Sequence, residues 1–160
     1  MTHEPHDKLQ ADDAPAGSSR MVPVTEGEWA GWYTWVPVDD FEDHTGPFYC
    51  RPEQGGYLCG FIPEAKNRNG GGNIHGGALM TFADYALFMG ALGADPALHG
   101  VTLTMNCEFI GAAEPGRLLT ARTEIVREGH SIVFARGTID DEGRPVLTFS
   151  ATIKKLKRRG

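Results

Sequence analysis

The sequence predicts an α+β fold in which one long helix packs against an antiparallel sheet. Residues 76–92 form one apolar segment with the length of a buried helix. Four successive β-rich runs follow it, separated by turn residues, and the first and last of them alternate apolar and polar residues. Because helices do not alternate with strands, a doubly wound parallel sheet is excluded, and the helix must cover one face of a single sheet.

The region before the helix contains shorter elements. Residues 24–36 hold all three tryptophans, and Thr25 followed by Glu28 has the pattern of a capping box, which predicts a short helix. We expect the tryptophans to pack the N-terminal part of the domain, with the lining of a substrate pocket as the alternative. A loop broken by proline and aspartate follows, and residues 47–50 and 56–62 are expected to be strands.

The second half of the chain has the periodicity of strands. Odd positions from Val101 to Phe109 are apolar and the even positions are polar, which is typical of a strand with one face on a core. Two further β-rich runs are joined by Glu128-Gly129-His130, which predicts a hairpin. The expected strands occupy residues 101–109, 118–127, 131–139 and 147–153.

The length of 160 residues fits one domain, which we place at residues 21–160. Residues 1–20 are polar and rich in proline and glycine, so we expect a disordered leader without the apolar core of a secretory signal. Met21 is considered as an alternative start, and the sequence leaves the choice open. The apolar segment 76–92 contains Asp84 at its middle and is short for a membrane span, so no membrane partner is expected.

Charge and cysteines exclude several classes of function. The net charge of −6 makes nucleic acid a poor partner. Five of the last seven residues are basic and form either a solvated tail or a patch for an anionic ligand such as a nucleotide phosphate. They are Lys154, Lys155, Lys157, Arg158 and Arg159. Three scattered cysteines without a C-x-x-C spacing argue against a disulfide framework or a metal site and fit a reducing cytoplasm.

Glycine is the compositional outlier, with 21 residues, five of them between Gly70 and Gly77. This run lacks the lysine of a P-loop and the third glycine of a dinucleotide fingerprint. No G-x-S-x-G sequence accompanies it. The run instead leads into a helix that begins at Gly76 and Gly77, where free backbone N–H groups suit a developing oxyanion. The alternative is that the glycines serve only a tight turn.

Asp84 is the only carboxylate, lysine or arginine residue between Gly70 and Ala94. A buried carboxylate is costly, so it is neutralised, paired or used in chemistry. Either Asp84 is a general base or nucleophile with a raised pKa, or it is a structural acid bonded to a neighbour such as Thr81. Gly76 and Asp84 lie roughly 12 Å apart along a helix axis, so they cannot act on one carbonyl within one chain. A catalytic site therefore predicts a dimer that shares its sites across a two-fold axis.

The segment from Asn69 to Asp84 reads N-x-x-G-x-x-H-G-G-A-L-x-x-x-A-D. It resembles the active-site signature of hotdog-fold acyl-CoA thioesterases of the PaaI-like group, which is related to the 4-hydroxybenzoyl-CoA thioesterases. The resemblance covers roughly residues 46–155. It implies a hotdog fold, in which one long central helix is wrapped by an antiparallel sheet of about five to six strands.

The resemblance also implies a reaction, which is hydrolysis of acyl-CoA or aroyl-CoA without a cofactor. The Gly76 amide would bind the thioester oxygen with help from Gly77, and Asp84 of the partner chain would activate water or attack the carbonyl. Further roles implied by the resemblance fall on three residues: Asn69 would orient the water or nucleophile, His75 would hold the loop near the thioester, and Thr102 would orient water.

The family pattern leaves some points open. Some relatives have a serine or threonine hydroxyl one helical turn after the acid, whereas this chain has Phe88 at that position. A water-holding role at this position is therefore not expected. Without the resemblance, His75 would be interpreted as a loop histidine with a structural role, and Thr102 as an ordinary strand threonine. Assembly as a homodimer at least, and a homotetramer by family analogy, is expected. The alternatives to a thioesterase are a non-catalytic acyl-CoA or acyl-carrier binding module and a hotdog hydratase or dehydratase.

Overall fold

The computed structural model describes residues 20–36, 39–95 and 98–157. The elements are β1 (Arg20–Pro23), β2 (Tyr33–Val36), α1 (Asp40–Thr45), β3 (Tyr49–Glu53), β4 (Gly56–Phe61), the 3₁₀ turn η1 (Ala65–Asn67), α2 (Gly76–Leu92), β5 (Leu98–Phe109), β6 (Leu119–Glu128), β7 (Ile132–Asp141) and β8 (Arg144–Lys157). The expected leader lies outside the described residues except for Arg20, where β1 begins.

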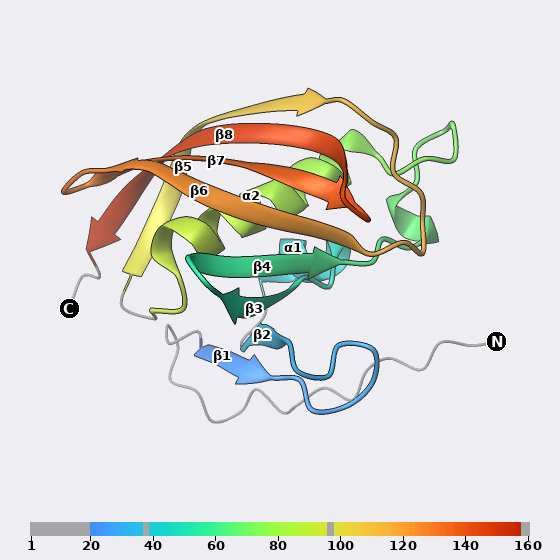
Figure 1. Ribbon diagram of the computed structural model, residues 1–160, viewed down its shortest axis with the longest axis horizontal. Coiled ribbons are helices and arrows are strands. Elements are labelled where there is room, and N and C mark those ends of the chain that lie inside the picture. Colours follow the sequence, from blue (N-terminus) through green and yellow to red (C-terminus); the bar gives the residue numbers. More distant parts are fainter. Residues whose placement is uncertain (1–19, 37–38, 96–97, 158–160) are drawn as a thin grey trace.

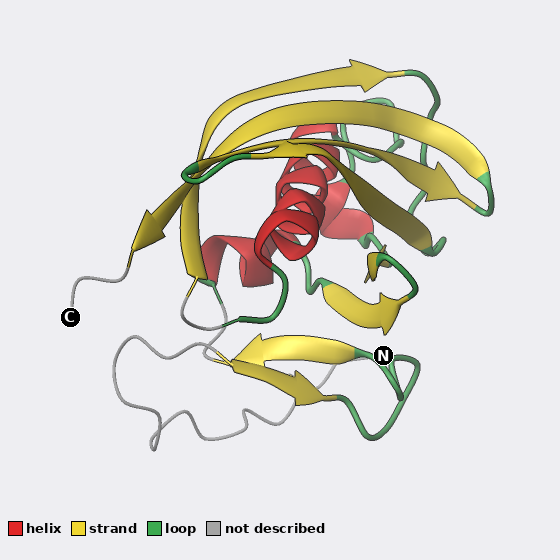
Figure 2. Ribbon diagram, turned by 60° about the vertical axis from the view of Figure 1, so that its left-hand side comes forward, coloured by secondary structure: helices red, strands yellow, loops and turns green. Residues whose placement is uncertain are grey.

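The strands form one antiparallel sheet in the order β1-β2-β3-β4-β6-β7-β8-β5. The sheet curves around α2, as Figures 1 and 2 show, and the core lies between them. An aromatic cluster fills one end of this core, with the Phe61 ring centroid 4.9 Å from Phe48 and 5.4 Å from Phe82. The predicted α+β architecture with one long central helix is therefore confirmed.

Helix α2 has the predicted bounds because the apolar run is uninterrupted and both ends are defined. His75 caps its start, where the ring nitrogen Nδ1 accepts a hydrogen bond from the Gly77 amide. Gly93 ends it at a φ of 64°, with its N–H donating to the Met89 carbonyl. A left-handed residue at this position is most easily supplied by glycine.

The predicted short helix in residues 24–36 is wrong. Thr25 is exposed in a loop that joins β1 to β2, and the Val24 N–H bonds to the Trp32 carbonyl at 2.8 Å across it. The loop holds Gly27 and Gly31 at φ values of 76° and 86°, which a helix does not tolerate. The hairpin adds two strands, so the sheet has eight rather than five or six.

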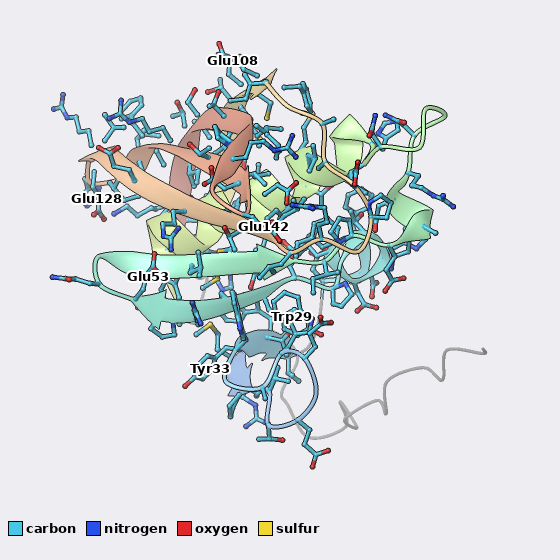
Figure 3. The ribbon with its side chains drawn as sticks, turned by 45° about the vertical axis from the view of Figure 1, so that its right-hand side comes forward. Trp29, Tyr33, Glu53, Glu108, Glu128 and Glu142 are labelled. Atoms are coloured by element: carbon cyan, nitrogen blue, oxygen red, sulfur yellow. The ribbon has the colours of Figure 1, made fainter. Side chains whose placement is uncertain are left out.

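The tryptophans pack as expected for the N-terminal part of the domain. Trp29 stacks on Tyr49 with ring centroids 4.3 Å apart and meets Trp32 edge to face at 5.0 Å. Both indoles lie against Gly60, so β4 is covered on this face as well as by α2. Figure 3 shows Trp29 beside strands β3 and β4, far from Glu108 at the other end of the sheet.

Strand β5 ends at Phe109 as predicted but begins three residues earlier, at Leu98, and part of its apolar face turns outward. A bulge at Leu103 shifts the register with β8 between Thr102 and Thr104. Before the bulge Thr102 faces α2, and after it Met105 packs against the core, while Leu103 itself stays exposed. A bulge reverses which side chains face the core, since the side-chain period of a strand is two.

Candidate active site

The turn before α2 presents one backbone N–H. The His75 side chain already uses the Gly77 amide, at 2.9 Å from its Nδ1. Gly76, as the first helical residue, has no preceding turn to accept its N–H, and this N–H donates to no other group within the described residues. Because Nδ1 accepts this hydrogen bond, Nε2 is the ring nitrogen that can donate one.

Asn67 holds this turn in place. It is buried, its Oδ1 accepts from the Glu64 N–H at 2.8 Å, and its Nδ2 donates to the Thr45 carbonyl at 2.7 Å. Its own carbonyl accepts the His75 N–H at 2.7 Å. Asn67 is not among the predicted site residues, because nothing in the sequence pattern singles it out.

Asn69, predicted to orient water, is exposed within the glycine loop. Its Oδ1 accepts from the Gly71 N–H at 2.9 Å, and its backbone pairs with Asn73. Both interactions stay inside the loop, so the side chain bonds to the turn rather than to the other predicted site residues of its own chain.

Asp84 lies at the middle of α2, where Thr102 of β5 reaches it. The Thr102 hydroxyl donates to Asp84 Oδ1 at 2.8 Å. Thr81, considered as a structural partner for this acid, instead donates to the Gly77 carbonyl at 2.9 Å. Asp84 is half-buried on the side of α2 that the sheet leaves uncovered, in line with Gly77, Met80 and Phe88.

The surroundings of Asp84 make its carboxyl easier to protonate than an exposed aspartate. Burial raises the pKa of its carboxyl, and the Thr102 hydrogen bond lowers it in part. A second carboxylate, Glu42 of α1, belongs to the same neighbourhood. Burial, followed by the charges of Asp39 and Asp84, raises the pKa of Glu42 to about 7.

Glu42 was not among the predicted site residues, although the sequence contains a signal for the helix that carries it. Asp39 caps α1 by accepting the Phe41 and Glu42 N–H groups at 3.0 and 3.1 Å. An aspartate followed three residues later by glutamate is a helix-start pattern. A loop was expected in this region, whereas the structure has the short helix α1.

The predicted site residues therefore lie in two separate groups. His75, Gly76 and Gly77 lie together at the start of α2, and Asp84 lies with Thr102 two turns along. Eight residues of helix place the groups roughly 12 Å apart, so one chain holds two halves of a site that do not meet.

A pocket of about 290 Å³ opens between α1 and the start of α2, and His75, Gly77, Lys66 and Arg68 line it. A larger hollow of about 930 Å³ contains none of the predicted site residues. Polar strand side chains line it, including the ion pair of Arg136 with Glu124.

Metal ligands, cysteines, membrane helices and the basic C-terminal residues were also considered in the sequence. Within residues 20–36, 39–95 and 98–157, no cluster of His, Cys, Asp and Glu could hold a metal ion, and the three cysteines are free. No helix in those ranges is long and apolar enough to cross a membrane. Of the basic C-terminal residues, Lys154 is exposed and Lys155 pairs with Glu128. Arg158 and Arg159 lie outside the described residues.

Comparison with known proteins relates this chain to one family. The family model described as the thioesterase superfamily matches residues 71–158, more than half of the chain. The Pseudomonas aeruginosa protein PA0474, named provisionally as an esterase, is 32% identical over 110 residues, which are 68% of this chain and 82% of that protein.

Solved structures show the same fold. The chain superposes on a hypothetical thioesterase of Streptococcus pneumoniae TIGR4, crystallised with coenzyme A, with a TM-score of 0.63 and 24% identity over 71% of this chain and 88% of that one. It also superposes on a phenylacetic acid degradation-related protein of Ralstonia eutropha JMP134, provisionally named a thioesterase. The TM-score is 0.65 and the identity 22%, over 74% of this chain and 92% of that one.

Proposed function

Since the chain belongs to the thioesterase superfamily, we propose that it hydrolyses acyl-CoA or aroyl-CoA to the free acid and CoA. The expected resemblance to hotdog thioesterases of the PaaI-like group is confirmed by the family match and the structural neighbours. The observation that carries the proposed reaction is the half-buried Asp84, held by Thr102 on the uncovered side of α2.

Two groups would perform the reaction. The Gly76 N–H donates to the thioester oxygen and stabilises the negative charge that develops there. Asp84 takes a proton from water as the water oxygen attacks the carbonyl carbon, and the thiolate of CoA then leaves. A carboxylate with a pKa raised by burial is a better base than an exposed one. Direct attack by Asp84 on the carbonyl is the alternative.

The two groups would meet between two copies of the chain. Strand β5 ends the sheet and leaves Val101 and Leu103 exposed by 43% and 51%. An edge strand with apolar side chains pairs readily with another chain. Antiparallel pairing about a two-fold axis beside β5 would also bring the uncovered sides of the two α2 helices together. Asp84 of one protomer would then lie near Gly76 of its partner.

The acyl group is carried by a coenzyme A thioester in this proposal. The Streptococcus pneumoniae protein was crystallised with coenzyme A. In this chain, Lys66 and Arg68 line the pocket beside His75, so cationic groups lie where the phosphates of a thioester substrate could approach the turn. A homotetramer, built as a dimer of dimers, is part of the same proposal and is measured by light scattering.

A panel of short, medium, long and aromatic acyl-CoA thioesters tests the proposal. We expect thiol release by the wild-type protein and its loss, by at least ~100-fold in kcat, in Asp84→Ala. Thiol release that survives this substitution would remove the proposed base. Tight acyl-CoA binding without turnover of any thioester would instead support a binding module.

A further inference from the structure

The Phe109 ring lies directly on Gly76. A Cβ added at Gly76 would be 3.0 Å from Cε1 and 3.1 Å from Cζ of this ring. Phe109 ends β5, opposite Leu147 of β8, and yet is 53% exposed. Phe109 belongs neither to the buried core nor to the residues packed against it, so the placement of its ring beside Gly76 is what sets it apart.

The backbone around Phe109 is fixed to the sheet and to the glycine loop. The N–H groups of Ile110 and Gly111 both donate to the Val146 carbonyl, at 3.0 and 3.1 Å. Two residues further, the Ala113 carbonyl accepts the Ile74 N–H at 2.8 Å. The ring is therefore mounted on a rigid support that also ties down the residues before Gly76.

We propose that Phe109 is a positioning residue that fixes the direction of the Gly76 N–H and keeps water from it. This inference rests on the proposed thioesterase function. An oxyanion donor works because it is preorganised in a site with little water. A displacement of about 1 Å at a reacting centre costs on the order of 100-fold in rate. A ring in van der Waals contact with the donor residue prevents such a displacement.

Strand β5 then supports both halves of the site. Thr102, near its start, bonds to Asp84, and Phe109, at its end, packs on Gly76. The strand that would lie at the interface between two chains thereby determines the position of the base and of the oxyanion donor.

Steady-state kinetics of Phe109→Leu, Phe109→Tyr and the control Phe134→Leu test the proposal. Phe134 lies on β7 and is 45% exposed, so it matches Phe109 in exposure but not in position. We expect kcat of Phe109→Leu to fall about 10-fold or more with KM changed less than about 2-fold. Phe109→Tyr retains the ring and should stay within about 2-fold of wild type, as should Phe134→Leu.

A double-mutant cycle with Gly76→Ala tests the contact itself. The new Cβ displaces the Phe109 ring, and a leucine at position 109 leaves room for it. We expect kcat of the double variant to be no lower than that of Gly76→Ala, whereas independent effects would multiply. Thermal melting of each variant separates loss of the fold from loss of positioning.

The outcomes distinguish the two proposals. A wild-type protein that turns over no thioester contradicts the proposed function. An active wild-type protein with unchanged kcat in Phe109→Leu overturns the positioning role, as does a change confined to KM or a double variant whose losses multiply.

Discussion

The hydroxyl of Thr102 donates a 2.8 Å hydrogen bond to Oδ1 of Asp84, and this contact depends on a bulge in β5. Without the bulge, the alternation of β5 would place either Thr102 or Met105 toward the helix, but not both. The extra residue, Leu103, lets the strand offer a polar group to Asp84 and apolar groups to the core beyond it.

Replacing Thr102 by valine should shift the pH dependence of hydrolysis. The hydrogen bond lowers the pKa of Asp84 against the raising effect of burial. Its loss should raise that pKa further, so the acidic limb of the profile of kcat against pH moves to higher pH. Thr104→Val, an exposed position on the same strand, should leave the limb in place. A limb that does not move, or moves to lower pH, contradicts a base at Asp84.

Replacing Gly76 by proline should remove the oxyanion donor without breaking α2. Proline is favoured at the first helical position, and His75 before it has the extended conformation that proline requires, with ψ at 136°. The matched control is Gly76→Ala, which adds the same Cβ and keeps the N–H. We expect kcat of the proline variant to lie ~100-fold or more below that of the alanine variant. Equal rates would assign the oxyanion to another donor.

The bounds of α2 were predictable from the sequence because an uninterrupted apolar run and its flanking glycines are local signals. The face that Thr102 occupies was not, since the bulge at Leu103 arises from the pairing of β5 with β8. Tertiary pairing also overrides the helix signal at Thr25, where residues 24 and 32 bond across a hairpin loop.

The same distinction applies to the site. The spacing of His75, Gly76 and Asp84 predicts two half-sites that one chain cannot join, and the structure has this separation. The role expected for Asn69 comes from the family resemblance, and no signal in the sequence singles out Asn67. Asn67 is buried and donates its amide to the Thr45 carbonyl, 22 residues away, a contact that the local sequence does not predict.

Glu42 should make stability depend on pH. Its pKa in the folded protein is about 7, raised from 4.5 by burial and then by Asp39 and Asp84. The stability it contributes is therefore fully present below about pH 4.5 and is lost as pH rises through about 7. We expect Glu42→Gln to stabilise the protein at pH 8 by on the order of 2 kcal/mol, and much less at pH 5.

Urea unfolding of Glu42→Gln at the two pH values measures this effect. Asp43→Asn, which removes an exposed charge from the same helix, is the control. A gain that is the same at pH 5 and pH 8 would show that Glu42 does not titrate in this range.

Gly90 should not tolerate alanine, although alanine favours a helix by about 1 kcal/mol over glycine. A Cβ at Gly90 would lie 2.5 Å from Thr123 Cβ and 2.6 Å from its Cγ2. Thr123 cannot easily move, because its hydroxyl donates to the Ala86 carbonyl at 2.9 Å. We expect Gly90→Ala to lower the free energy of unfolding by about 1–3 kcal/mol, with partial recovery in Gly90→Ala with Thr123→Ser, which removes Cγ2. A higher melting temperature in Gly90→Ala would contradict this close approach.

Mixing two inactive variants should restore activity if each site uses two chains. Asp84→Ala lacks the base and Gly76→Pro lacks the oxyanion donor, but a mixed dimer contains one site with Gly76 from the first chain and Asp84 from the second. Random exchange makes half of the dimers mixed, each with one of two sites intact, so we expect about a quarter of wild-type activity. The measurement is thiol release after the variants are unfolded together and refolded, with each variant refolded alone as the control. Full inactivity of a mixture that forms dimers by light scattering would place both groups of a site on one chain, which the separation of roughly 12 Å along α2 argues against.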